Sequence, residues 1–101
     1  MAMKRQIAAF ELSDGTSHEV RLLLADKIRA ERTRKARNWG ENDMAMTTLM
    51  VWSAAVRAGH YQGSFEEFQG TPEEPGDCVD LFVDQRERDE EDPTQPTSQT
   101  A

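Results

Sequence analysis

The side chains best suited to chemistry are few and far apart in this sequence of 101 residues. Two histidines and one cysteine are present: His18, His60 and Cys78. Structural zinc sites need closely spaced ligands, such as Cys-x-x-Cys or His-x-x-x-His, and neither spacing occurs. Cys78 with a distant histidine is the minimum for a nucleophilic thiol, but no catalytic signature surrounds it. We therefore expect no catalytic residue, metal or cofactor, and we expect Cys78 to be a half-buried apolar residue.

Carboxylates form a second group of candidates in the later part of the chain. They are Glu66, Glu67, Glu73, Glu74, Asp77 and Asp80. Paired carboxylates perform acid–base or metal chemistry only when a pocket holds them. These residues instead flank prolines and glycines, a composition typical of a loop. We expect them to form a solvated surface.

Cations form a third group, at Lys27, Arg29, Arg32, Arg34, Lys35 and Arg37. A helical wheel spreads these six around most of a helix. The whole chain has a net charge of −7, in which residues 1–39 contribute nine Lys or Arg and five Asp or Glu, a net +4, and residues 40–101 contribute −11. Because an acidic tail would compete with phosphates for the basic helix, we expect a solvated helix or a protein contact and no nucleic-acid binding.

Residues 4–23 have the pattern of a β-hairpin with the loop Ser13-Asp14-Gly15. A glycine at the end of a three-residue loop suits the left-handed backbone that follows a type I turn. The predicted register pairs Leu12 with Thr16, Phe10 with His18, Ala8 with Val20 and Gln6 with Leu22. This register gathers the apolar residues on one face. That face must pack on other elements, because a lone hairpin is marginal in water.

Helices are expected after the hairpin. The first spans residues 24–39, with Gly40 as the left-handed terminator. Asp26 is a plausible N-cap, although Ala25 or an earlier start is also possible. A short helix over residues 65–69 follows a capping box that begins at Ser64. Between them lies the longest apolar run of the chain, residues 44–58, which predicts a helix of about four turns.

The central helix is apolar on most sides. One stripe consists of Ala45, Leu49, Trp52 and Val56, and a second consists of Met46, Met50 and Ala54. Asn42 or Asp43 is expected to cap the helix, and Gly59 to end it. The run is too short and too polar to span a membrane. Since a domain of this size buries only about 60–65% of its unfolded surface, we expect part of the helix to stay uncovered.

The last apolar segment, residues 78–83, fits either a short strand or the start of a helix, and periodicity does not decide between them over so few residues. Residues 84–101 are acidic and then rich in Pro and Thr, so we expect a disordered tail. The expected architecture is therefore α+β. A single domain over residues 1–83 would pack an N-terminal β-hairpin on two main helices and a short third one.

The order of these features resembles the tail assembly chaperones of long-tailed bacteriophages, particularly those of actinobacterial phages. Three stretches carry the resemblance: Leu12-Ser-Asp-Gly-Thr16 leading into Leu24-Ala-Asp-Lys-Ile-Arg-Ala-Glu-Arg-Thr-Arg-Lys-Ala-Arg-Asn-Trp-Gly40, then Val51-Trp-Ser-Ala-Ala-Val-Arg-Ala-Gly59, and then Ser64-Phe-Glu-Glu-Phe68 ahead of an acidic Pro/Thr tail. The likeness covers roughly residues 10–70 and lies in order and spacing more than in any one motif.

The resemblance implies a non-enzymatic protein of the host cell cytoplasm that is not part of the mature virion. Such proteins bind and solubilise the tape measure protein during tail morphogenesis. The tail tube protein and a longer form made by programmed frameshifting are further expected partners.

From the residues themselves, we expect the contact with an apolar partner to use one strip of the central helix. Its members are Met46, Met50 and Ala54, with Arg57 at the rim. The alternative function is a small acidic regulator that binds a host protein or competes with nucleic acid.

Overall fold

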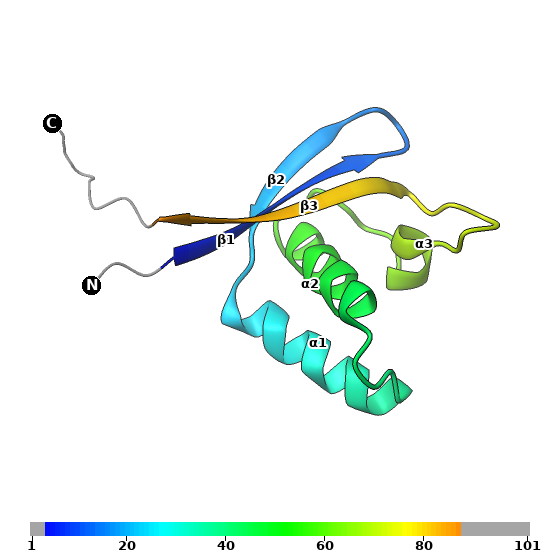
Figure 1. Ribbon diagram of the computed structural model, residues 1–101. Coiled ribbons are helices and arrows are strands. Elements are labelled where there is room, and N and C mark those ends of the chain that lie inside the picture. The colour runs from blue at the N-terminus through cyan, green and yellow to red at the C-terminus, as the bar shows by residue number, and fades with distance from the viewer. Residues whose placement is uncertain (1–3, 88–101) are drawn as a thin grey trace, which may run out of the picture.

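A computed structural model describes residues 4–87 and shows an α+β fold, as predicted. Its elements are β1 (Lys4–Leu12), β2 (Ser17–Arg21), α1 (Leu24–Arg37), α2 (Asp43–Arg57), α3 (Phe65–Gln69) and β3 (Cys78–Glu87). All three helices lie on one side of the sheet (Figure 1). Helix α2 lies against the sheet and α1 lies beyond α2, so the layers run sheet, α2, α1. No helix among the described residues is long and apolar enough to cross a membrane.

The three strands form an antiparallel sheet in the order β2-β1-β3. In the hairpin, Ala8 pairs with Val20 and Phe10 with His18, so the predicted register is confirmed. Gly15 closes the loop with a φ of 90°, a conformation that other residues rarely adopt. Alternation along β1 then points Ala8, Phe10 and Leu12 toward the helices, where all three are buried.

The structure decides the open question about the last apolar segment in favour of a strand. β3 pairs with β1 along its length and continues to Glu87, so the folded part extends past the predicted boundary at Val83. Leu81 and Val83 face the core, but an irregularity in the pairing with Glu11 and Leu12 leaves Val79 52% exposed. The rest of the predicted disordered tail lies outside the described residues.

Two helix starts are confirmed and two features of α1 need correction. Asn42 caps α2 by accepting a hydrogen bond from Ala45 N at 3.1 Å, and the capping box before α3 is present. Asp26, however, is the third residue of α1 and not its N-cap, which is Leu23. The helix ends on the left-handed Asn38, two residues before the predicted terminator, because Asn tolerates that conformation better than most residues.

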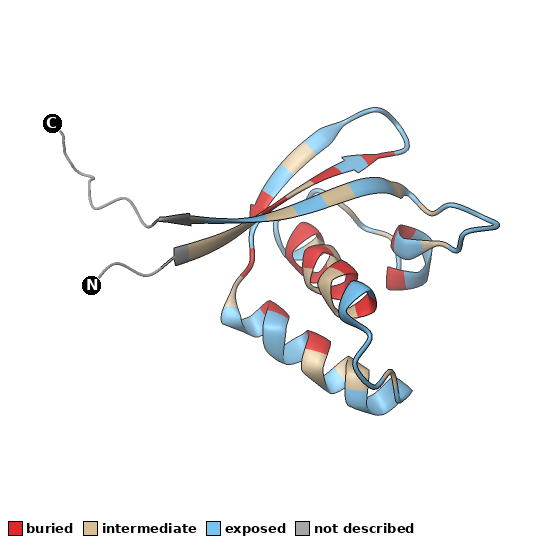
Figure 2. Ribbon diagram, viewed as in Figure 1, coloured by how far each residue is buried: buried red, intermediate tan, exposed pale blue. Residues whose placement is uncertain are grey.

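The core lies between the sheet and α2 and continues into the space between α1 and α2 (Figure 2). Its larger part consists of Ala8, Phe10, Leu12, Val20, Leu22, Val51, Ala54, Ala55 and Phe68, and its smaller part of Ala30, Leu49 and Phe65. The sheet, α1 and α3 thus cover α2 on different sides. As a result, a smaller part of the surface of α2 is exposed than we expected from its apolar sequence.

A buried carboxylate ties the layers together where β2 leads into α1. Asp26 is almost completely buried and accepts hydrogen bonds from Leu23 N at 2.9 Å, Ser53 Oγ at 2.8 Å and Arg57 Nη2 at 2.8 Å. Burial acts to raise the pKa of Asp26, but these hydrogen bonds and the Arg57 charge outweigh it and lower the pKa. One side chain therefore joins the start of α1 to two positions on α2.

We expect Asp26→Asn to lower the free energy of unfolding at neutral pH by about 2–3 kcal/mol, because it removes charged hydrogen bonds and leaves Arg57 without its counterion. The lowered pKa makes this stabilisation fully present above the ordinary Asp value of about 3.9, and it is lost as the pH falls through the native value. Urea unfolding at several pH values measures both effects.

The control for this experiment is Glu31→Gln, which removes the exposed ion pair between Glu31 and Arg34 on the same helix. Solvent screens that pair, so its loss should change stability much less. An equal effect of the two substitutions, or a difference between wild type and Asp26→Asn that persists unchanged into acid, would contradict the assigned role of Asp26.

Candidate functional site

The predicted contact strip on α2 faces α1 in the structure. Met46 and Met50 are half-buried and pack against the smaller core cluster between these helices. Ala54 has no exposed surface. The strip is therefore corrected at Ala54, which no partner can reach in this conformation. The sequence argument failed here because it did not foresee that Ala54 would pack in the larger core cluster, together with residues of β1 and β2.

Arg57 also has a structural role that the sequence did not indicate. Its Nη2 atom donates to Asp26 Oδ2 at 2.8 Å and to the backbone carbonyl of Arg21 at 2.9 Å. The side chain thus links the end of α2 to the end of β2 and to the start of α1. A guanidinium held by two acceptors is less available to a partner than a rim residue would be.

Exposed apolar surface occurs instead at the first turn of α2. Met44, Thr48, Val51 and Ala55 follow one stripe of the helix, and the last three are buried. Met44 continues the same stripe beyond the part that the sheet covers, and it is 69% exposed. Met44 is therefore the exposed first member of a stripe whose other members are buried in the core.

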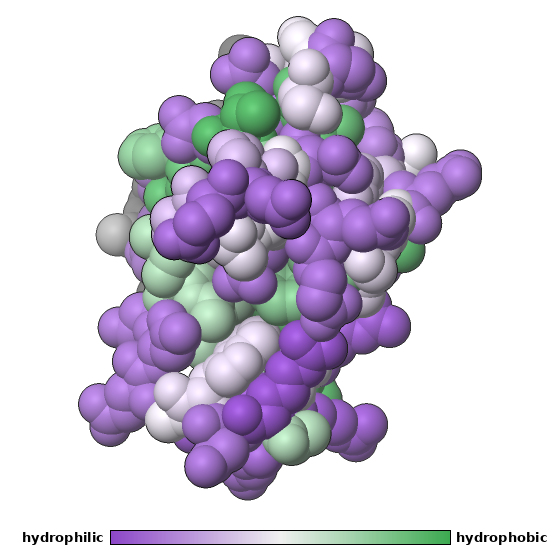
Figure 3. Space-filling view, turned by 90° about the vertical axis from the view of Figure 1, so that its right-hand side faces the viewer, coloured by the Kyte–Doolittle hydropathy of each residue, from purple (hydrophilic) through white to green (hydrophobic). Residues whose placement is uncertain are grey.

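A groove lies beside Met44, between α2 and the start of β3. It has a volume of about 300 Å³. Its lining consists of Met44, Thr48, Phe68, Gln69, Cys78, Val79, Asp80 and Leu81. The residue displaced by the irregularity in β3, Val79, forms the opposite wall. On the side of the molecule that carries α3 and the loop before β3, hydrophobic side chains emerge between hydrophilic ones (Figure 3).

The chemistry of this groove favours apolar contact over catalysis. Its volume is at the lower limit of the roughly 300–1,000 Å³ usual for small-molecule sites. The one thiol, Cys78, donates a hydrogen bond to the carbonyl of Asp80 at 3.3 Å. Burial raises the pKa of Cys78, which keeps the thiol protonated and weakens it as a nucleophile. The groove suits apolar side chains of a partner.

Only part of this groove could be found from the sequence. The spacing of Met44, Thr48 and Val51 was a usable signal, since it continues a buried stripe to the helix start. Val79 gave no such signal, because its exposure depends on how β3 pairs with β1. The half-buried position of Cys78 agrees with its predicted role as a small apolar residue.

The two histidines, 42 positions apart in sequence, are neighbours in space. The rings of His18 and His60 stack with centroids 4.5 Å apart and an interplanar angle of 22°. His18 lies in β2 and His60 follows α2, as expected. Within residues 4–87, no group of three or more His, Cys, Asp and Glu residues is placed to hold a metal ion.

The charged side chains are largely engaged in structural contacts or face solvent. Arg29 lies over the ring of Trp52 at 5.1 Å, and Arg37 pairs with Glu66 at 2.5 Å. Tyr61 donates to Asp77 at 2.7 Å; burial and this hydrogen bond raise the pKa of Tyr61. The cations of α1 are spread around the helix, as predicted, and do not form a single phosphate-binding face.

No known protein family, curated protein or solved structure matches the chain.

We expect Met50→Ala to lower the free energy of unfolding by about 1–2 kcal/mol, because it opens space between α1 and α2. The matched control is Met44→Ala, which should change stability by less than about 0.5 kcal/mol, because Met44 is largely exposed. Urea unfolding of the two variants beside wild type tests this. Equal costs at both positions would show that Met50 is no more part of the core than Met44.

Proposed function

We propose that this chain is a non-enzymatic chaperone of phage tail assembly, which binds the tape measure protein in the cytoplasm of the infected cell. The observation that supports the proposal is the groove of mixed lining that is bordered by two exposed apolar side chains, Met44 and Val79. The order of sequence features resembles that of tail assembly chaperones, and from this resemblance we infer that the partner is the tape measure protein. The tail tube protein and a longer frameshifted product remain proposed partners of the same process.

The composition of the groove suits a partner that must be released later. Methionine is flexible and polarizable, so Met44 adapts to apolar side chains of different shapes. A groove of this size takes only a few side chains, so each contact is weak. A long apolar protein could then be covered by several chaperone copies and freed step by step.

The proposal predicts that a double substitution, Met44→Glu with Val79→Glu, abolishes solubilisation of the tape measure protein, because it places two charges in an apolar contact. The measurement is co-expression of the full chain with the tape-measure-like protein encoded nearby, followed by affinity purification. An unrelated hydrophobic coiled coil serves as control prey.

Ala36→Glu is the matched control variant, because Ala36 is exposed but lies on α1, away from the groove. It should retain the prey. If wild type and the control retain the prey and the double variant does not, the groove is the contact. If the double variant also retains it, the groove is wrong. If wild type neither solubilises nor retains the prey, the chaperone proposal is overturned and the acidic-regulator alternative takes its place.

A further inference from the structure

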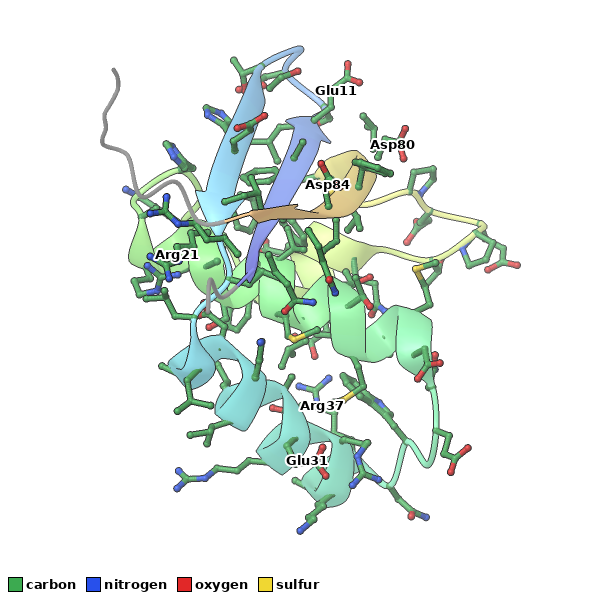
Figure 4. All side chains as sticks on the ribbon, turned by 60° about the vertical axis from the view of Figure 1, so that its left-hand side comes forward. Glu11, Arg21, Glu31, Arg37, Asp80 and Asp84 are labelled. Carbon is green, nitrogen blue, oxygen red and sulfur yellow. The ribbon has the colours of Figure 1, made fainter. Side chains whose placement is uncertain are left out.

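Two surfaces at opposite ends of the layered fold lack a covering element among the described residues. One is the outer face of the sheet, which points away from the helices (Figure 1). The other is the outward face of α1, which points away from α2. In Figure 4, Glu11, Asp80 and Asp84 lie on the sheet, and Glu31 and Arg37 lie on α1. Helix α2 lies between the sheet and α1.

The outer sheet face has an aromatic and apolar centre, with the carboxylates of Glu11 and Asp80 at the end near the hairpin loop and the cations Arg5 and Arg21 toward the other end. Since β1 directs Ala8 and Phe10 inward, the residues between and beside them point outward together with their β3 partners. The outward pairs of β1 and β3 are Ile7 with Asp84, Ala9 with Phe82, and Glu11 with Asp80. Phe82 is 66% exposed and borders a shallow depression of about 200 Å³.

The outward face of α1 has the opposite character. Asp26 and Ala30 are buried and mark the side that faces α2. On the other side, Leu24 and Ile28 are 71% and 45% exposed, one turn apart. Arg32 and Lys35 continue this face along the next two turns, and both are exposed. Glu31 lies on the same face but is paired with Arg34. α1 therefore presents an apolar pair followed by a face on which cations predominate.

We propose that the outward face of α1 in one copy of this chain docks on the outer sheet face of a second copy. The apolar pair on α1 would cover Phe82, and the cations of α1 would lie near the acidic end of the sheet at Glu11 and Asp80. The dimensions agree: 14 residues of helix span about 21 Å, and nine residues of strand about 30 Å. A helix covering an open sheet is a common layer arrangement.

Charge complementarity is the reason for choosing a second copy as the occupant. The same molecule carries both halves of the contact: cations on the outward face of α1, and the carboxylates of Glu11 and Asp80 at one end of the outer sheet face. The net charge of −7 on each copy opposes association only over a distance of about 8 Å at physiological ionic strength, so local charges dominate at contact. Because different surfaces meet, the contact is head-to-tail and joins more than two copies, in closed rings or in open chains.

The experiment uses two full-length variants, Ile28→Glu and Phe82→Glu, each with one damaged face. In sedimentation velocity, wild type should show a mass that rises with concentration above the 11.5 kDa of one chain. Each variant alone should be monomeric, with association weakened at least about tenfold. Mixing the two variants should restore one intact contact and give a 1:1 dimer that does not grow further.

Three results would overturn the proposal: a wild type that stays monomeric, one variant that still associates by itself, or a mixture that forms no dimer. Circular dichroism verifies that each variant is folded, and Ile28→Ser with Phe82→Ser repeats the test if a glutamate unfolds the chain. A further variant changes Asp89, Glu90, Glu91 and Asp92 to their amides. Loss of wild-type association in it would identify the chain's own tail as the ligand of α1 and also overturn the proposal. No tape measure protein is present, so the outcome is independent of the proposed function.

Discussion

The carboxylate of Asp26 is the constraint on which the arrangement of the layers depends. An almost completely buried charge is costly unless its acceptor sites are filled. Here a backbone amide, Ser53 and Arg57 fill them, and those donors come from the start of α1 and from two successive turns of α2. Because Arg57 also binds the carbonyl of Arg21, the same group fixes the end of β2. The direction of α1 relative to α2 and the sheet follows from these few bonds.

Local chemistry explains which parts of the fold were predictable. The loop ending in Gly15, the cap at Asn42 and the capping box at Ser64 each depend on residues within four positions of one another, and all three are present as expected. The end of α1 was misplaced because Asn38 and Gly40 both accept left-handed backbone. The role of Asp26 was misread for a related reason. An acidic residue near the start of a helix can either be the N-cap or, from the first turn, accept a hydrogen bond from the backbone N–H of the residue that precedes the helix. For Asp26, the hydrogen bonds with Ser53 and Arg57 on α2 favour the second position.

Features that depend on tertiary packing could not be obtained from periodicity. Met46 and Met50 form a good contact strip on a wheel, yet α1 covers much of it, whereas Met44 extends beyond the sheet. Likewise, the strand at Cys78–Glu87 is defined by its partner β1, since its own six apolar-rich residues fit two structures equally well. Which apolar side chains of α2 are exposed therefore depends on how far the neighbouring helix and strands extend along it.

The position of β1 in the middle of the sheet has a consequence for the order in which the chain folds. Its first neighbour, β2, follows within a few residues, but its second neighbour begins at Cys78. The hairpin can therefore form before the rest of the domain is made, while the other edge of β1 stays open until the residues of β3 have also left the ribosome. Such non-local pairing slows folding, because a long loop must close before the new contacts form. Until then the backbone N–H and C=O groups along that edge of β1 lack the partners that β3 provides.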